Sequence, residues 1–479
     1  MEENIIMIRE AVPLRPEYRF DRPVNWSIER GQHWAIIGPN GSGKTLLTNM
    51  LMGKLVLKTG IIDYAFNNDR LGVEQIEAAS FQDVHAIADY QNFYYQQRWN
   101  ASEIADSPWV RDLLKDVVSE SQLQDLFSLF GLSELLDKQL ILLSNGELRK
   151  FSIIRKLLKK PRILILDNPY IGLDSSTRVL LNDLLNQIIR REALNIVMVL
   201  SNPAEIPDFT THVLPVFHHK RLGESLTIST FRHHPTLLNE LFPCDASMPV
   251  LPVQQLQSTD YNIALKLQNV HINYGKRVII DRINWSVKKG EKWALLGPNG
   301  SGKSTLLSLI YADNPQSYAN SLYLFDKKRG SGESIWEIKK RIGYVSPEIH
   351  LYCRRNPTSI HLVASGFFDS DAIYTKCNTE QLQTARHWMD IFGITDLQDR
   401  PFLQLSLGEQ RLVMLARAFV KNPELLILDE PLHGLDVSNK ISVLNIIEAF
   451  CNQQDKTMIY VTHYQDEIPS CVDKYFVME

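Results

Sequence analysis

The feature that most constrains this chain is an internal repeat, because one long pattern occurs twice in its 479 residues. The segment VNWSIERGQHWAIIGPNGSGKTLL, from Val24, matches INWSVKKGEKWALLGPNGSGKSTLL, from Ile283. Later in each copy, LSNGELRKFSIIRKLLKKPRILILDNP, from Leu143, matches LSLGEQRLVMLARAFVKNPELLILDEP, from Leu405. A pattern repeated over this length predicts two copies of one domain in tandem.

The repeat also sets the expected domain boundaries. We expect a first domain at residues 1–217, a linker at 218–262 and a second domain at 263–479. Four prolines in the linker exclude one long helix there. Its two histidine pairs, His218-His219 and His233-His234, lack the acidic or cysteine neighbours of a metal site, so we interpret them as polar linker residues.

Composition is that of an ordinary globular protein, with 44% hydrophobic and 22% charged residues. The net charge of −4 gives no strong signal for nucleic acid or for an anionic membrane surface. Five cysteines without CxxC spacing argue against a disulfide framework and suit a reducing compartment. The N-terminal sequence lacks signal-peptide features, and no apolar run reaches the roughly 18–20 residues of a membrane span. We therefore expect a cytoplasmic chain that meets the membrane only through a partner.

A glycine-rich loop of sequence GPNGSGK[ST] follows a short apolar strand in each copy, at Trp34–Ile37 and at Trp293–Leu296. Such a loop forms a nest of backbone N–H donors at a helix N-terminus, which binds phosphate. The lysine is expected to reach the β- and γ-phosphates of ATP, and the residue after it to place a hydroxyl on Mg²⁺. The predicted nucleotide-binding residues are Gly38, Pro39, Asn40, Gly41, Ser42, Gly43, Lys44 and Thr45 in the first loop, and Gly297, Pro298, Asn299, Gly300, Ser301, Gly302, Lys303 and Ser304 in the second.

An aspartate ends a run of four apolar residues in each copy, ILIL before Asp167 and LLIL before Asp429. Continuous apolar runs suit parallel strands that are buried on both faces. Carboxylate oxygens are hard ligands of the kind that Mg²⁺ prefers. We therefore expect Thr45 with Asp167, and Ser304 with Asp429, to hold a magnesium ion in the two copies.

The sequences LSNGE and LSLGEQ narrow the class of phosphate-loop protein. Each begins a helical stretch, with its serine 23 residues before the aspartate. They resemble the LSGGQ signature of the ATP-binding cassette (ABC) superfamily, and the resemblance covers nearly the whole chain outside the linker. Both depart from the signature, because Asn145 and Leu407 replace its first glycine, at the third position, and Glu147 and Glu409 replace its glutamine.

The resemblance implies an α/β fold of two tandem P-loop nucleotide-binding domains. Each would have a mostly parallel sheet, a helical signature subdomain and an antiparallel β part. In this family two cassettes face head to tail, each completing the other's ATP site, and one chain with two cassettes can close on itself. A linker of about 45 residues, which spans roughly 35–40 Å, favours this internal pairing.

Further site residues follow from the resemblance, one position at a time. Tyr274 corresponds to the aromatic residue that stacks on adenine, whereas the first copy has Arg15 there, with Tyr18 or Phe20 available only after a shift. Gln82 is the candidate for the glutamine loop. The second copy has Pro347 or Glu348 in its place.

The copies differ at the residues that the family uses for hydrolysis. A glutamate normally follows the aspartate, but the first copy has Asn168 where the second has Glu430. A histidine normally follows the next strand, but the first copy has Ser201 where the second has His463. An amide cannot accept a proton, and general base catalysis contributes roughly 10²–10⁴-fold. We expect a competent site of Lys303, Ser304, Asp429, Glu430 and His463 with Ser144 and Gly146, and a mainly binding site of Lys44, Thr45, Asp167 and Asn168 with Ser406 and Gly408.

The leading interpretation is the ATP-hydrolysing subunit of an ABC transport system, working with a separate permease at the inner face of the membrane. The chain is similar to a twin-cassette group of molybdenum-transport (photorepair) ATP-binding proteins, which implies molybdate or another small solute. Two alternatives remain. One is a twin cassette acting on ribosomes or translation, and the other is a nucleic-acid maintenance ATPase or a nucleotide-sensing binding module without a transport role. The first typically has a charged helical arm and two intact glutamates, and the second has long coiled coils. The aromatic segment NFYYQQRW (92–99) either packs in the helical subdomain or docks a partner.

Overall fold

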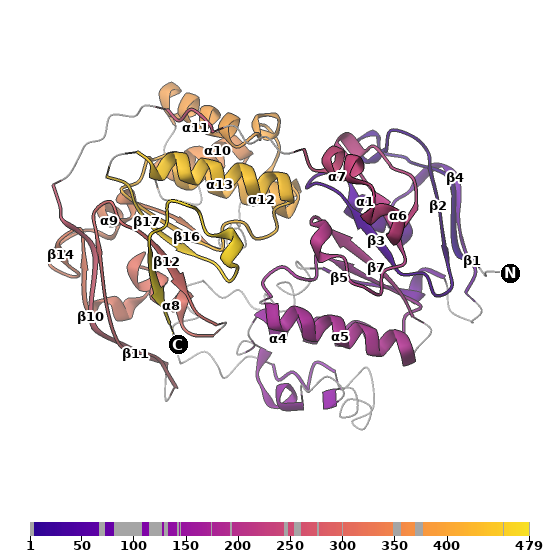
Figure 1. The fold of residues 1–479 in the computed structure, drawn as a ribbon, viewed down its shortest axis with the longest axis horizontal. Coiled ribbons are helices and arrows are strands. Elements are labelled where there is room, and N and C mark those ends of the chain that lie inside the picture. Colours follow the sequence, from indigo (N-terminus) through magenta and orange to yellow (C-terminus); the bar gives the residue numbers. More distant parts are fainter. Residues whose placement is uncertain are drawn as a thin grey trace. The chain divides into compact units, whose positions relative to one another are not determined.

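The apolar runs that end in an aspartate form buried strands in the computed structural model. It describes residues 4–66, 72–80, 108–114, 127–128, 133–140, 143, 145–173, 175–191, 194–243, 248–252, 260–274, 277–298, 300–347, 356–368, 377–453 and 455–478. The chain divides into two units, one holding most of residues 1–244 and the other most of residues 245–479 (Figure 1). Each unit is built on its own central sheet.

The central sheet of the first unit has the strand order β5-β6-β7-β3-β8-β9. All neighbours are parallel except β9, which pairs antiparallel with β8. A separate antiparallel sheet has the order β2-β1-β4. The strands are β1 (Asn4–Pro13), β2 (Val24–Glu29), β3 (Trp34–Ile37), β4 (Leu57–Tyr64), β5 (Ile76–Ser80), β6 (Ile163–Asp167), β7 (Asn195–Leu200), β8 (His212–Pro215) and β9 (Leu226–Thr227).

The helices of the first unit include the two that follow the sequence motifs, and these are α1 (Lys44–Leu51) and α4 (Asn145–Leu157). The others with described bounds are α5 (Ser175–Arg191), α6 (Ile228–Arg232) and α7 (Pro235–Leu241). The segment from β9 to α7 falls in the stretch that the sequence suggested as a linker. Its Phe231, Leu241 and Phe242 are buried in the core of the first unit, so this stretch is packed there.

The second unit repeats this plan with a parallel sheet of order β15-β16-β17-β12-β18 and an antiparallel sheet of order β11-β10-β13-β14. The strands are β10 (Ile263–Tyr274), β11 (Arg277–Lys288), β12 (Lys292–Leu296), β13 (Ser321–Leu324), β14 (Lys327–Lys328), β15 (Ile342–Val345), β16 (Leu425–Asp429), β17 (Thr457–Val461) and β18 (Lys474–Val477). The helices are α8 (Lys303–Ile310), α9 (Ile335–Arg341), α10 (Ser359–Ala364), α11 (Thr379–Ile391), α12 (Leu407–Phe419) and α13 (Val437–Cys451). The predicted α/β fold class is thus confirmed.

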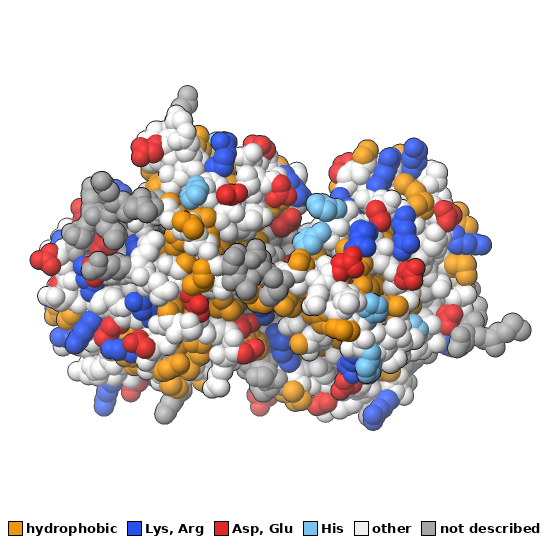
Figure 2. Space-filling view, turned by 45° about the horizontal axis from the view of Figure 1, so that its top comes forward, with side chains coloured by type: hydrophobic (Ala, Val, Ile, Leu, Met, Phe, Trp, Pro, Cys, Tyr) orange, Lys and Arg blue, Asp and Glu red, His pale blue; other side chains and the backbone are white. Residues whose placement is uncertain are grey.

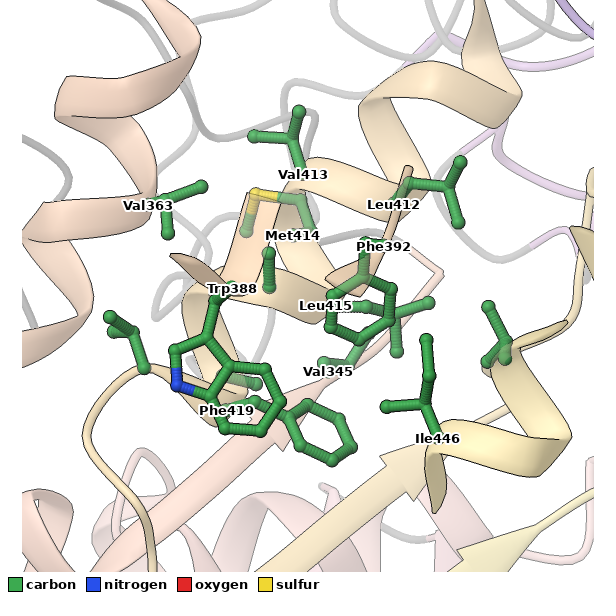
Figure 3. Packing of buried hydrophobic residues seen from close by; sticks show 14 of the residues in the cluster. Val345, Val363, Trp388, Phe392, Leu412, Val413, Met414, Leu415, Phe419 and Ile446 are labelled. Carbon is green, nitrogen blue, oxygen red and sulfur yellow. The ribbon is translucent and has the colours of Figure 1, made fainter. Parts of the chain in front are cut away.

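Helix α12 is the centre of the largest core of the second unit. Its side chains are buried on all sides from Gln410 to Phe419, as expected of a helix between a sheet and other helices. The Phe419 ring lies 5.4 Å from the Trp388 ring of α11 (Figure 3). It also lies 4.9 Å from the Phe450 ring of α13. The same core includes Leu426 and Leu428 of β16, so this packing connects the helical part of the unit to the sheet.

In each unit, one side chain stabilises the turn before the strand that leads to the phosphate loop. In the second unit, Glu291 accepts hydrogen bonds from the Lys288 amide and from the Trp293 ring, both at 2.9 Å, and pairs with Lys474. In the first unit, Gln32 at the aligned position bonds the amide of Glu29 and the ring of Trp34, both at 3.1 Å. The same turn is therefore held with a charged residue in one copy and a neutral one in the other.

The surface agrees with the near-neutral composition. On the face drawn in Figure 2, Lys and Arg side chains are interspersed with Asp and Glu side chains. Within the described part of the chain, every helix is too short or too polar to cross a membrane.

Candidate active sites

The phosphate loop of the first unit runs from the end of β3 to the start of α1. The Lys44 ammonium is buried and donates hydrogen bonds to the carbonyl oxygens of Gly38 and Pro39, both at 2.7 Å. A Cβ atom at Gly38 would lie 1.9 Å from the Val216 carbonyl oxygen, so only glycine fits there. Gly43 has φ +100° at the N-cap of α1, which a glycine adopts without strain.

The loop of the second unit has the same geometry. The Lys303 ammonium donates to the carbonyl oxygens of Gly297 and Pro298, both at 2.8 Å. A Cβ atom at Gly297 would lie 2.5 Å from the Met478 carbonyl oxygen. Gly302 is the N-cap of α8 with φ +91°. The predicted residue Asn299 lies outside the described residues.

Both loops fit a bound phosphate chain. The hydroxyls of Ser42 and Ser301 are buried and have no hydrogen-bond partner among the described residues. Gly41 and Gly300 have φ of +71° and +85°, the left-handed conformation that forms a nest of backbone N–H groups. With the lysine at its end, each loop gathers donors and a positive charge that an anion with several oxygens can satisfy.

The predicted magnesium ligands of the first unit lie in contact. The Thr45 hydroxyl donates to one Asp167 oxygen at 3.0 Å, and the Asn168 amide donates to the other at 2.9 Å. In the second unit, Asp429 is buried at the end of β16, and Ser304 is exposed at the second residue of α8. A hydroxyl and a carboxylate are suitable oxygen ligands for Mg²⁺, so both sets of residues fit the ion.

The residue after the aspartate has the same unusual backbone in both units. Glu430 and Asn168 have φ of +48° and +49°, in the left-handed region. The N–H of Glu430 bonds the Val461 carbonyl of β17, and that of Asn168 bonds the Val199 carbonyl of β7, both at 2.9 Å. The two units therefore present different side chains from one main-chain geometry.

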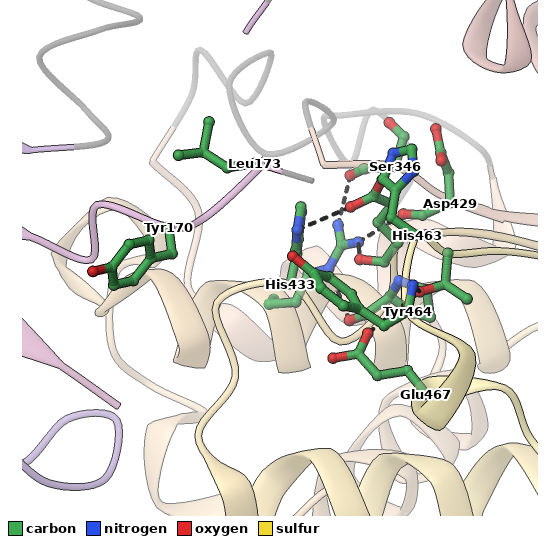
Figure 4. A network of polar contacts seen from close by, with 12 residues as sticks. Tyr170, Leu173, Ser346, Asp429, His433, His463, Tyr464 and Glu467 are labelled. Carbon is green, nitrogen blue, oxygen red and sulfur yellow. Dashed lines mark hydrogen bonds and ion pairs between the residues drawn. The ribbon is translucent and has the colours of Figure 1, made fainter. Parts of the chain in front are cut away.

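The Glu430 carboxylate is held by two histidines (Figure 4). His463 Nε2 lies 2.7 Å from Oε1, and His433 Nε2 lies 2.9 Å from Oε2. Burial alone would raise the pKa of the Glu430 carboxyl, but the charges and hydrogen bonds of His433 and His463 hold this pKa well below its usual range. The structure thus brings Glu430 and His463 together and adds a histidine that the family resemblance did not indicate.

The first unit lacks all three of these groups. Aligned with His433, three residues after Asn168, is Ile171. Ser201, aligned with His463, donates its hydroxyl to the Asn40 side chain of the phosphate loop at 3.2 Å. The only sequence signal for His433 was that the two copies differ at this position, where the first has Ile171.

The signature serine of the second unit is the N-cap of α12. The Ser406 hydroxyl accepts from the Glu409 amide at 3.4 Å, and the Glu409 carboxylate accepts from the Ser406 amide at 2.7 Å, which is a capping box. The hydroxyl keeps its own proton for donation, next to Gly408 in the first turn of the helix. In the first unit, Gly146 lies in the first turn of α4, and Ser144 falls outside the described residues.

The glutamates that replace the signature glutamine each lie near a basic side chain. Glu147 pairs with Lys138 at 2.8 Å, and Glu409 lies 3.8 Å from the Arg400 guanidinium. Lys138 and Arg400 occupy aligned positions in the two copies. The departure from the family signature is therefore matched by a nearby positive charge in both units.

Arg411, in the second turn of α12, fixes the main chain of the second site. Its guanidinium is buried and donates to the carbonyl oxygens of Ser346 at 2.6 Å, Asp429 at 2.8 Å and Pro431 at 3.1 Å, and to that of Glu430. Burial lowers the pKa of Arg411 to about 10. No pattern in the sequence indicated this role for Arg411.

The residue at the predicted adenine-contact position is Tyr274 in the second unit and Arg15 in the first. Tyr274 is the last residue of β10, and its hydroxyl accepts from the Asn314 amide at 2.9 Å. Arg15 at the aligned position is exposed, with its guanidinium 5.7 Å from the Tyr18 ring. Phe20 is buried, and its ring approaches the position of a Cβ at Gly43 to 3.5 Å. Gln82, Glu348 and the aromatic segment 92–99 lie outside the described residues.

Comparison with known proteins agrees with this arrangement. A sequence profile described as "ABC transporter" matches residues 22–171 and 280–433. The chain is 34% identical to "ABC transporter ATP-binding protein ModF" of Escherichia coli (strain K12), covering 93% of this chain and 91% of that protein. It is 30% identical to an uncharacterized ABC transporter ATP-binding protein of Schizosaccharomyces pombe, over 94% and 93% of the two chains.

Solved structures share the fold at lower identity. The archaeal ribosome recycling factor aABCE1, solved in complex with the ribosomal stalk protein aP1, superposes with a TM-score of 0.56 at 18% identity. The match covers 98% of this chain and 86% of that one. At this identity the likeness concerns the arrangement of strands and helices alone.

Proposed function

Since the chain belongs to the ABC transporter family and is an ATPase with two cassettes, we propose that its two sites divide the work. The second cassette performs most of the hydrolysis, and the first chiefly binds nucleotide. The observation that carries this proposal is the buried Glu430 carboxylate between two histidines, at a position where the first cassette has Asn168.

The residues of the second cassette suit each part of the reaction. Lys303, the Ser301 hydroxyl and the loop amides bind and orient the phosphates. The Glu430 carboxylate can orient the attacking water and take up its proton, because an ionised carboxylate has four acceptor positions and the histidines use two. Mg²⁺, held by Ser304 and Asp429, would neutralise charge on the phosphate oxygens. The signature residues of the first cassette, Ser144 and Gly146, complete the site when the cassettes pair.

The first cassette suits retention of ATP. Lys44, Thr45 and Asp167 supply the phosphate and metal contacts, and Ser406 and Gly408 complete the site from the second cassette. The Asn168 amide cannot accept a proton from water. ATP bound there would stabilise the closed pair of cassettes by mass action, with hydrolysis at the second site controlling release.

We further propose that the chain energises a separate membrane permease. The relative named as a transporter ATP-binding protein, 34% identical over nearly the full length, supports this role. The likeness to molybdenum-transport proteins makes molybdate, or another small solute, the first candidate for the cargo. The chain would then act at the inner face of the membrane.

The rate of ATP hydrolysis tests the division of work. We expect Glu430→Gln to lower the turnover by at least about 100-fold, within the range of general base catalysis, and to leave ATP binding intact. Asn168→Ala, the matched change in the first cassette, should alter nucleotide affinity more than turnover. Near-normal hydrolysis by Glu430→Gln would refute the assignment.

Co-purification tests the partner. The Glu430→Gln variant, held with ATP in detergent extracts, should retain a permease, and cells lacking the chain should take up less molybdate. Recovery of ribosomes or of DNA in place of a permease would contradict the transport role.

The mass of the Glu430→Gln variant with ATP tests whether the two cassettes of one chain pair with each other. A stable dimer of chains would contradict internal closure.

A further inference from the structure

His433 contacts the Glu430 carboxylate from the same loop that carries it. The two side chains are each 11% exposed, so the contact is largely shielded from water. His463, which is 9% exposed, approaches the other carboxylate oxygen from the segment after β17. Both oxygens of one carboxylate are therefore held by imidazole nitrogens from two different segments (Figure 4).

The backbone of this loop is tightly fixed. The His433 amide donates to the Glu430 carbonyl at 3.2 Å, which closes a turn over the three-residue spacing. Gly434, with φ +75°, continues the turn, and Leu432 and Leu435 are buried in the core on either side. The imidazole of His433 is thus delivered to the carboxylate by a rigid piece of chain.

A glutamate side chain has several rotatable bonds and loses rotamer freedom when it is held in one orientation. Arg411 holds the backbone carbonyl of Glu430, but this contact leaves the Glu430 side chain able to rotate about its own bonds. The contacts to His433 and His463 define the plane of the carboxylate. Since Oε2 accepts from His433, the Nε2 atom of this ring carries the proton.

We propose that His433 is a positioning residue for ATP hydrolysis in the second cassette, fixing the Glu430 carboxylate through its Nε2–H. This inference rests on the proposed function, in which Glu430 orients and deprotonates water. Two acceptor positions of the carboxylate remain for that water when both histidines are bound. The side chain of Ile171, at the aligned position, cannot donate a hydrogen bond, so the first cassette lacks this support as well as the carboxylate.

Two substitutions separate hydrogen bonding from packing. His433→Phe keeps a ring and loses the donor, whereas His433→Gln loses the ring and keeps an N–H at a similar reach. Because a hydrogen bond to a charged group is among the stronger ones in proteins, His433→Phe should lower kcat by about 10- to 100-fold with little change in the KM for ATP. His433→Gln should recover most of kcat. His387→Phe, at an exposed histidine of α11, is the matched control and should match the wild type.

The outcomes distinguish this inference from the proposed function. A wild-type kcat for His433→Phe, with hydrolysis still abolished by Glu430→Gln, would overturn the role of His433 alone. Near-normal hydrolysis by Glu430→Gln would instead overturn the proposed function. A kcat for His433→Phe equal to or above that of His433→Gln would show a packing role and contradict the inference.

A double-mutant cycle guards against loss of folding. In a Glu430→Gln background, His433→Phe should cause no further fall in the residual rate, because the carboxylate it serves is already gone. ATP affinity and the melting temperature are measured for each variant. An additive fall in the double variant at unchanged ATP affinity would contradict positioning through Glu430.

Discussion

Replacing Arg411 by methionine should destabilise the second unit and disturb its active site together. Methionine keeps much of the aliphatic stem and removes the guanidinium, which donates to the carbonyl oxygens of Ser346, Asp429, Glu430 and Pro431. These acceptors lie in a closely packed region where no bulk water replaces the lost donor. The change therefore leaves buried carbonyl groups without their charged partner.

The magnitude follows from opposing contributions. Four hydrogen bonds from a charged donor, at about 1.5–3 kcal/mol each, would sum to about 6–12 kcal/mol if they were additive. Taking a guanidinium out of water costs several kcal/mol, and the lowered pKa of Arg411, about 10, reflects this cost. We expect a net loss of about 3–5 kcal/mol in the free energy of unfolding.

Urea unfolding of the full chain measures the loss, with hydrogen exchange of the α12 and β16 amides assigning it to the second unit. Arg417→Met is a matched control in the same helix, since the Arg417 Nε bonds the Ser365 hydroxyl at 3.0 Å. Arg411→Met should lower kcat for ATP as well as stability, whereas Arg417→Met should affect stability alone. A loss below about 1 kcal/mol with wild-type turnover for Arg411→Met would refute the reasoning.

Three further predictions concern the asymmetry, pH and metal. With the second site inactivated, the triple change Asn168→Glu, Ile171→His and Ser201→His should create measurable hydrolysis in the first cassette, and Asn168→Glu alone should recover less; equal rates would contradict the role of the histidines. Burial alone would raise the pKa of the Glu291 carboxyl, but its hydrogen bonds with Lys474 and with the turn lower this pKa below the ordinary value of 4.5. The ionised Glu291 therefore stabilises the fold above the pKa of the unfolded state, and this stabilisation is lost as the pH falls through the lower pKa of the folded state. Glu291→Gln should flatten this acid dependence and cost about 1 kcal/mol at neutral pH, with Gln32 of the first unit as the neutral reference. An unchanged pH profile of urea unfolding would contradict this prediction. Chelation of Mg²⁺ by EDTA should abolish hydrolysis, with recovery on adding Mg²⁺; full activity in EDTA would contradict the oxygen-ligand assignment.

The features that the sequence predicted well are those with local patterns. The runs before Asp167 and Asp429 became buried strands because a parallel sheet covered on both faces requires continuous apolar residues. The phosphate loops were equally clear, because their glycines meet steric demands within a few residues. At Gly38 a side chain would collide with the chain at Val216, and the loop sequence alone cannot show that contact.

The residues that sequence reasoning missed act through contacts between distant segments. Arg411 bonds carbonyl oxygens, which every residue possesses, so its partner at Ser346 leaves no trace in the side-chain pattern. His433 lies only three residues from Glu430, but its contact depends on a turn that the left-handed backbone at Glu430 begins. Both contacts exist only once the chain is folded. A comparison of the two copies can show that the residues differ, but it cannot show which atoms they contact.

The matching left-handed backbones at Asn168 and Glu430 carry a consequence for how the two halves diverged. After an ancestral gene duplicated, the scaffold of this loop stayed under the same folding demand in both copies, since the N–H of each residue still completes a bond to the neighbouring strand. Selection could then alter the chemistry of one half by exchanging side chains, without remodelling the main chain. Such an exchange of side chains is open to reversal, because both copies keep the same main-chain geometry at this position.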